Sequence, residues 1–91
     1  MLNEDVLKEF LFECEVRKLS KRTVQSYRNA NLRMMKYLEK EFNITELEQT
    51  HHLAIRAYIK YQTSQGLAET YINRNIIAYR CYFKYCVQEG Y

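Results

Sequence analysis

Apolar residues recur at intervals of three and four along this chain, the spacing that places side chains on one face of an α-helix. We expect a first helix capped by Asn3 and ending near Arg17. A second, longer helix begins after Ser20, whose hydroxyl is suited to cap a free backbone N–H, and ends at Asn43. The apolar positions of this second helix are Val24, Tyr27, Ala30, Met34, Met35, Leu38 and Phe42.

The second half of the chain predicts a short turn and two further helices. One turn over residues 44–49 leads to Thr50, which we expect to cap a third helix from His51 to about Ser64. Gly66 can adopt the left-handed conformation that ends a helix, and the fourth helix runs from about Glu69 to Gln88. The pattern therefore predicts an all-α fold, a compact bundle of four main helices with one extra turn.

Composition is consistent with a single small domain over residues 1–91, because a chain of this length has room for one hydrophobic core. Hydrophobic residues make up 47% of the chain and charged residues 27%, which is typical of a folded protein rather than a disordered one. There is no proline to interrupt a helix. No apolar run reaches about 18 residues and the start of the chain does not resemble a signal peptide, so we expect a cytoplasmic protein without a membrane partner.

Residue types that often carry chemistry form no catalytic or metal-binding pattern here. Cys14, Cys81 and Cys86 include no Cys-x-x-Cys pair, so we expect reduced thiols that pack as small apolar side chains. His51 and His52 are adjacent, so on a helix they point about 100° apart and cannot share a metal ion. We predict no metal, no cofactor, no small-molecule substrate and no catalytic activity of this chain on its own.

Charge is distributed unevenly along the sequence. Two segments, Val16–Leu38 and Thr70–Gln88, contain no acidic residue, whereas acids gather near the start and between Glu39 and Glu48. The basic residues of the two segments are Arg17, Lys18, Lys21, Arg22, Arg28, Arg33, Lys36, Arg74, Arg80 and Lys84. This separation predicts a polyanionic partner that contacts two particular helices. Solvated helix faces would produce the same pattern, so charge alone leaves both interpretations open.

Two sequence motifs give the pattern a more specific meaning. Leu19–Tyr27 reads Leu-Ser-Lys-Arg-Thr-Val-Gln-Ser-Tyr, which fits Leu-Ser-x-x-Thr, then three residues of any type, then Tyr. Gly66–Tyr85 contains Gly-Leu, then Ile-Asn-Arg at residues 72–74 and Ala-Tyr-Arg-Cys-Tyr-Phe-Lys-Tyr at 78–85. In order and spacing these motifs resemble the SAM-like core-binding domain that precedes the catalytic domain of phage integrases and other tyrosine recombinases. The resemblance covers nearly the whole chain.

This resemblance implies a DNA-binding domain that grips one side of a recombination-site duplex during DNA integration or recombination. It implies that the catalytic residues lie in a following domain that is absent from this chain. The expected partners are double-stranded DNA and, in a full-length protein, the chain's own catalytic domain and neighbouring recombinase protomers. The sequence departs from the family at two positions, with Ala68 where a capping Ser is common and Tyr71 where Thr is common.

Charge and resemblance select the same two helices for DNA contact. The start of the second helix offers free backbone N–H groups, which suit a phosphate, and Arg and Asn farther along can read guanine and adenine edges in the major groove. The candidate DNA-binding residues are Lys18, Ser20, Lys21, Arg22, Thr23, Ser26, Arg28, Asn29, Arg33, Thr70, Tyr71, Asn73, Arg74 and Arg80. Asn75 is a further candidate beside them.

Two other functions fit parts of the sequence. A free-standing helical DNA-binding regulator would share the basic helices, although such proteins normally read two-part operators as dimers and no tight recognition-helix turn is evident. A protein-interaction module would use an exposed aromatic patch, for which the candidate residues are Tyr71, Tyr82, Tyr85 and Tyr91.

Overall fold

Four α-helices and one short 3₁₀ turn make up the computed structural model, which describes all 91 residues. The elements are α1 (Asn3–Val16), α2 (Lys21–Phe42), η1 (Leu47–Gln49), α3 (His52–Ser64) and α4 (Glu69–Gln88). The predicted all-α class, the number of helices and the extra turn are therefore confirmed. Asn43 and Gly66 both adopt the left-handed backbone conformation, with φ of 54° and 76°. As expected, Asn43 ends α2 and Gly66 follows the end of α3.

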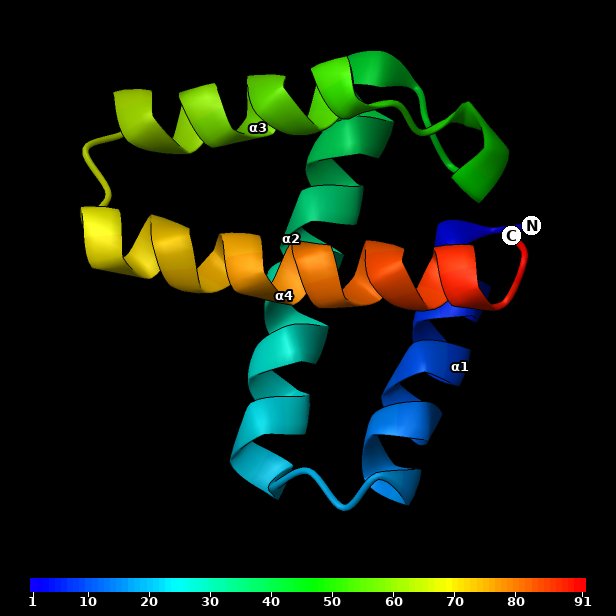
Figure 1. Cartoon of the computed structure of the whole chain (residues 1–91). Helices are drawn as coiled ribbons and strands as arrows, with labels where there is room; N and C mark the ends of the chain where they lie inside the picture. The colour runs from blue at the N-terminus through cyan, green and yellow to red at the C-terminus, as the bar shows by residue number, and fades with distance from the viewer.

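The helices form two pairs that cross each other steeply (Figure 1). α1 lies beside the first half of α2, and α3 lies beside α4. α2 is the central element, because it contacts all three other helices. Both ends of the chain lie on the side of the molecule where α4 ends (Figure 1). This arrangement leaves one face of α2 beside the first half of α4 and places α1 and α3 on opposite sides of α4.

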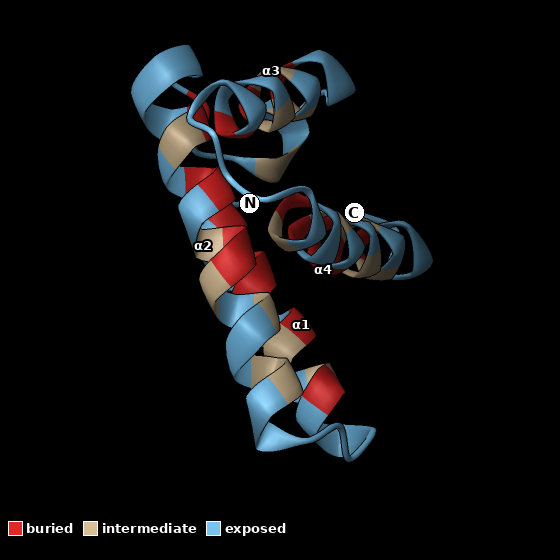
Figure 2. Ribbon diagram, turned by 90° about the vertical axis from the view of Figure 1, so that its left-hand side faces the viewer, coloured by how far each residue is buried: buried red, intermediate tan, exposed pale blue.

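The core lies where the two helix pairs cross. Figure 2 shows that the buried positions of α2 form a stripe on the side that faces the other helices. The largest fully buried side chains are Tyr82, Met34, Leu38, Val6 and Asn31. The apolar face predicted for α2 is buried or partly buried except at its last position, because Phe42 lies at the helix end and is 41% exposed. Burial of this stripe is the main source of stability for a helix in a small bundle.

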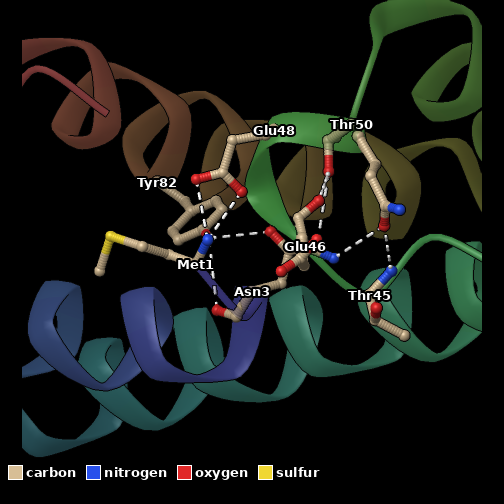
Figure 3. Close-up of polar contacts among 8 residues, drawn as sticks. Met1, Asn3, Thr45, Glu46, Glu48, Thr50 and Tyr82 are labelled. Carbon is tan, nitrogen blue, oxygen red and sulfur yellow. Dashed lines mark hydrogen bonds and ion pairs between the residues drawn. The ribbon is translucent and has the colours of Figure 1, made fainter.

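Asn3 has a different role from the cap predicted for it. The N-cap of α1 is Leu2, and Asn3 is a buried residue of the first helical turn. The Tyr82 hydroxyl donates to both the Oδ1 and the backbone carbonyl of Asn3 at 3.4 Å, and Asn3 Nδ2 donates to Thr50 Oγ1 at 3.3 Å (Figure 3). Asn3 therefore joins α1 to α4 and to the segment before α3, which are contacts that local spacing cannot predict.

The start of the chain is also tied to the 44–49 turn. Figure 3 shows the Met1 ammonium group against the Glu48 carboxylate, with N–O distances of 2.7 and 2.8 Å. The Leu47 N–H donates to the Met1 carbonyl at 2.8 Å, and the Asn3 N–H donates to the Thr45 carbonyl at 3.0 Å. The hydrogen bond from the ammonium group raises its pKa and lowers the pKa of Glu48. The short turn therefore serves as an anchor for the beginning of α1.

The cap predicted for α3 is one residue too early. His51, not Thr50, is the N-cap, and its Nδ1 accepts the Ala54 N–H at 3.3 Å. The Thr50 hydroxyl instead donates to the Glu46 carbonyl at 3.3 Å, in addition to accepting from Asn3. Thr50 thus closes the η1 turn rather than starting the helix.

Ser20 caps α2 as predicted, since its Oγ accepts the Thr23 N–H at 3.1 Å. Replacing Ser20 with Ala is expected to lower the free energy of unfolding by about 1 kcal/mol, the usual cost of losing such a cap. Urea denaturation followed by circular dichroism measures this difference. Ser26→Ala, a change of the same chemistry in the exposed interior of α2, is the matched control and should be neutral or slightly stabilising. Equal costs for the two changes would contradict the capping role.

Candidate nucleic-acid interface

A cleft of about 420 Å³ lies between α2 and the first half of α4. Its lining residues are Arg22, Gln25, Ser26, Asn29, Arg33, Tyr71, Arg74 and Asn75. On α2, the intervals from Arg22 to Ser26, Asn29 and Arg33 are four, three and four residues. This spacing places the four residues on a single helix face. The structure therefore brings six of the predicted DNA-binding residues together, along with Asn75.

Positive charge in the cleft is not neutralised by the protein. Arg22, Arg33 and Arg74 line it, and no Asp or Glu does. The two ion pairs of the structure lie elsewhere, between the Met1 ammonium group and Glu48 and between Arg17 and Glu13. A concave surface with guanidinium groups of one sign attracts a polyanion and offers planar donors that match phosphate oxygens.

Tyr71 and Arg33 join the two walls of the cleft. The guanidinium carbon of Arg33 lies 5.8 Å from the centre of the Tyr71 ring, which is a cation–π distance. Tyr71 is one of the two positions where the sequence departs from the family motif. In this structure the aromatic ring lies against a cleft arginine, a cation–π contact that a Thr side chain at this position could not make.

The floor of the cleft is polar and buried. Asn75 is only 4% exposed. Nearby, Asn31 Nδ2 donates to the carbonyls of Tyr27 at 2.9 Å and of Ala78 at 3.3 Å, which fastens α2 to α4. This cross-link between the two helices fixes the spacing of the cleft walls, because a buried amide cannot give up its acceptors without cost.

Two buried tyrosines feel the charge of the cleft residue Arg33, Tyr58 on α3 and Tyr79 on α4. Burial raises the pKa of both phenols above the ordinary value, and the opposing effect of the Arg33 charge is smaller. A phenol is already neutral at physiological pH, and burial makes ionisation of these two still less favourable. Because no phenolate forms there, the positive charge of the cleft is undiminished.

The start of α2 offers a smaller anion site than the sequence suggests. The Ser20 hydroxyl donates to Thr23 Oγ1 at 2.9 Å while it accepts the Thr23 N–H, so both hydroxyls are engaged with each other. The capping bond leaves the backbone N–H groups of Lys21 and Arg22 as free donors of the first turn. The predicted phosphate site is therefore reduced to these two groups and their side chains.

Other predicted DNA-binding residues are exposed but do not line the cleft. They are Lys18, Lys21, Arg28, Thr70 and Asn73. Arg28 follows Arg22 by six residues, a rotation of about 240° around the helix, and so lies on another flank of α2. Asn73 follows Tyr71 by two residues, about 200°, and so lies on the far side of α4. Helical rotation, rather than sequence distance, separates these residues from the cleft.

Arg80 and Gln25 differ most from the expectation. Arg80 lies in a separate groove between α3 and α4, about 180° around α4 from Tyr71.

Gln25 lines the cleft but was missed by the sequence analysis. Its Nε2 donates to Asn29 Oδ1 at 3.2 Å. The i, i+4 spacing of these two amides on one helix is the signal that identifies it.

The aromatic patch proposed for a protein-interaction module is not present. Tyr82 is fully buried, with 0% exposure, because it packs in the core against Phe10. Tyr71 and Tyr91 lie at opposite ends of α4, which spans about 30 Å for its 20 residues. The patch of four tyrosines is therefore wrong as predicted, because Tyr82 is in the core and Tyr71 lies at the other end of α4 from Tyr85 and Tyr91, whose ring centres are 6.5 Å apart.

The thiols and the side chains that could ligate a metal ion do not cluster. Burial raises the pKa of the Cys14 and Cys86 thiols, which keeps them protonated and poorly nucleophilic. All three cysteines are free, as predicted. Nowhere do three His, Cys, Asp or Glu side chains come together in a way that suits a metal ion. None of the helices is both long and apolar enough to cross a membrane.

Comparison with known proteins agrees with the two motifs. The family model described as the phage integrase, N-terminal SAM-like domain, matches residues 7–90. No curated protein and no solved structure gives a match. The family match includes most of α1 and all of α2, α3 and α4, with both walls of the cleft. The chain therefore belongs to the phage integrase N-terminal SAM-like domain family, the core-binding DNA-binding module of tyrosine recombinases.

Proposed function

We propose that this domain grips one side of a recombination-site duplex through the cleft between α2 and α4. In this role it is the non-catalytic DNA-binding part of a site-specific tyrosine recombinase that acts in DNA integration or recombination. One observation carries the proposal: three arginines from two helices line a single cleft that contains no acidic residue. The family membership of the chain supports the same partner.

Different cleft residues suit different parts of the duplex. Arg22 and Arg74 are exposed and suit phosphate oxygens, together with the free N–H groups at the start of α2. Asn29 accepts from Gln25 through its Oδ1, which leaves its NH₂ group available to donate to a base edge. The guanidinium group of Arg33 lies over the Tyr71 ring and lines the same cleft. The remaining exposed candidates, such as Lys18, Lys21 and Arg28, would add contacts along the backbone on either side.

The domain alone should bind weakly, because it contacts the duplex from one side only. In a full-length recombinase a following catalytic domain would hold the opposite side, so that the two linked contacts reinforce each other. Neighbouring protomers on the same recombination site would add further stability by the same principle. Chemistry on the DNA would then belong to the catalytic domain, while this domain positions the duplex.

Fluorescence anisotropy with a mixed-sequence duplex over a salt series tests the proposal. Three cleft arginines on phosphates predict that the logarithm of the affinity falls with the logarithm of the salt concentration with a slope of about −2.7 or steeper. The domain should not nick or join the duplex. Absence of binding even at low salt would contradict the proposed grip and leave a protein partner as the better explanation of the basic helices.

A further inference from the structure

Four buried side-chain atoms have no hydrogen-bond partner within the chain. They are Asn31 Oδ1, Gln62 Oε1, Asn75 Nδ2 and Tyr79 Oη. A buried polar group without a partner lowers the stability of a fold, because it gave up its hydrogen bonds to water on folding. Among these four residues only Asn75 lines the cleft between α2 and α4. One unsatisfied donor therefore belongs to the surface of the proposed DNA grip.

Asn31 shows how a buried amide is satisfied in this fold. Its NH₂ group donates to two carbonyls, those of Tyr27 and Ala78. Asn75 is almost as deeply buried, yet its NH₂ group donates to nothing in the chain. Turning the Asn75 amide about its Cβ–Cγ bond therefore breaks no hydrogen bond of this group. Asn75 keeps both N–H donors for a group that enters the cleft.

The neighbours of Asn75 select the chemistry of that group. Tyr71 lies one helical turn before Asn75 on α4, and the guanidinium group of Arg33 lies over the Tyr71 ring. Arg22 and Arg74 are the other cations of the cleft, which has no acidic residue. An amide N–H among guanidinium groups suits an anion with several acceptor oxygens, because different donors can bind different oxygens.

Shape distinguishes a phosphate from a base. Phosphates form the outer ridges of a duplex, whereas base edges lie at the bottom of a major groove that is about 8.5 Å deep. A cleft receives a ridge, and base edges are instead reached by side chains that project into the groove. We propose that a backbone phosphate enters the cleft and accepts a hydrogen bond from the Asn75 NH₂ group at its floor. This inference rests on the proposed DNA grip and makes Asn75 a contact that is independent of base sequence.

A donor that only the DNA satisfies makes stability and binding change in opposite directions. Asn75→Leu replaces the amide with an apolar group of the same branched shape, so the urea midpoint of the free domain should rise. The same change should weaken duplex binding about tenfold, the usual effect of one hydrogen bond to a charged group. Because Asn75 is neutral, the salt slope should stay that of the wild type. The loss should also be equal on duplexes of different sequence.

Urea denaturation and fluorescence anisotropy with three duplexes of unrelated sequence, each over a salt series, test the inference. Gln62→Leu is the matched control, because Gln62 is 3% exposed, has an unpartnered Oε1 and does not line the cleft. This control should bind each duplex like the wild type. Asn75→Ala also removes the amide, and it replaces Asn75→Leu in the binding measurement should the larger side chain prevent folding.

The expected result is a higher urea midpoint for Asn75→Leu, with an equal loss of affinity on all three duplexes. If the wild type binds and both Asn75 variants bind equally well, the role of Asn75 is wrong while the DNA grip stands. A loss that depends on sequence would place a base, not a phosphate, in the cleft. If the urea midpoint and the affinity fall together in both variants, Asn75 only supports the fold. A wild type that binds no duplex would contradict the grip and the inference together.

Discussion

Replacing Arg22, Arg33 and Arg74 with Ala in one variant is expected to weaken duplex binding by about a hundredfold or more. The three guanidinium groups line one cleft without an acidic neighbour, so each can release counterions from the DNA when it binds a phosphate. Removing three such contacts should also flatten the salt dependence by about 2.7 in slope. Fluorescence anisotropy over the salt series described for the wild type measures both quantities.

A second triple variant separates the cleft from net charge. Lys40, Arg56 and Lys60 are exposed cations that neither line the cleft nor belong to the candidate DNA-binding residues, and their replacement with Ala removes the same total charge. We expect this control to lose much less affinity than the cleft variant. Equal losses would show that only the overall charge of the domain matters, and the assignment of the cleft as the DNA contact would then be wrong.

Tyr82→Ala is expected to lower the free energy of unfolding by about 3–5 kcal/mol, the range for truncating a large buried aromatic side chain. Tyr82 is fully buried, and its ring centre lies 5.7 Å from that of Phe10 and 5.0 Å from that of Phe83. The change leaves a cavity at the point where α1 meets α4 and removes a donor from Asn3. Since small domains are stable by only about 5–15 kcal/mol, urea denaturation should show a large shift of the midpoint.

Two other substitutions test the cause of this loss of stability: one removes only the Tyr82 hydroxyl, and the other removes an exposed tyrosine as a control. Tyr82→Phe keeps the ring and loses only the hydroxyl, so a cost of about 1 kcal/mol is expected from the hydrogen bonds to Asn3. Tyr91→Ala removes an exposed ring at the end of the chain and should cost less than about 1 kcal/mol. If Tyr82→Ala were no more costly than Tyr82→Phe, the ring would not be part of the core.

The helices themselves were predictable because their signals are local. The apolar face of α2, the cap at Ser20 and the helix ends at Asn43 and Gly66 all depend on residues within one or two turns of each other. The two motifs that identify the family are local in the same sense, and the match over residues 7–90 confirms what they indicated. The prediction that α2 and α4 contact DNA likewise followed from charge along the chain and from the resemblance.

The composition of the cleft was only partly predictable. Arg22, Ser26, Asn29 and Arg33 share a face of α2 by their spacing alone. Which residues of α4 face them depends on how α4 is rotated against α2, and that rotation is set by packing of the core. Charge and resemblance assigned Arg80 to the same surface, but the rotation of α4 places its side chain in the groove between α3 and α4.

The sequence by itself therefore determined the secondary structure, the family and the two helices that carry the basic residues, because each depends on near neighbours. The tertiary structure decided the burial of Tyr82, the role of Asn3 and the separation of the cleft from the α3–α4 groove. The bonds from Asn3 reach Thr50 and Tyr82, which are 47 and 79 residues away in the sequence. Contacts over such distances exist only after the two helix pairs have crossed and buried their apolar faces, so no local pattern encodes them.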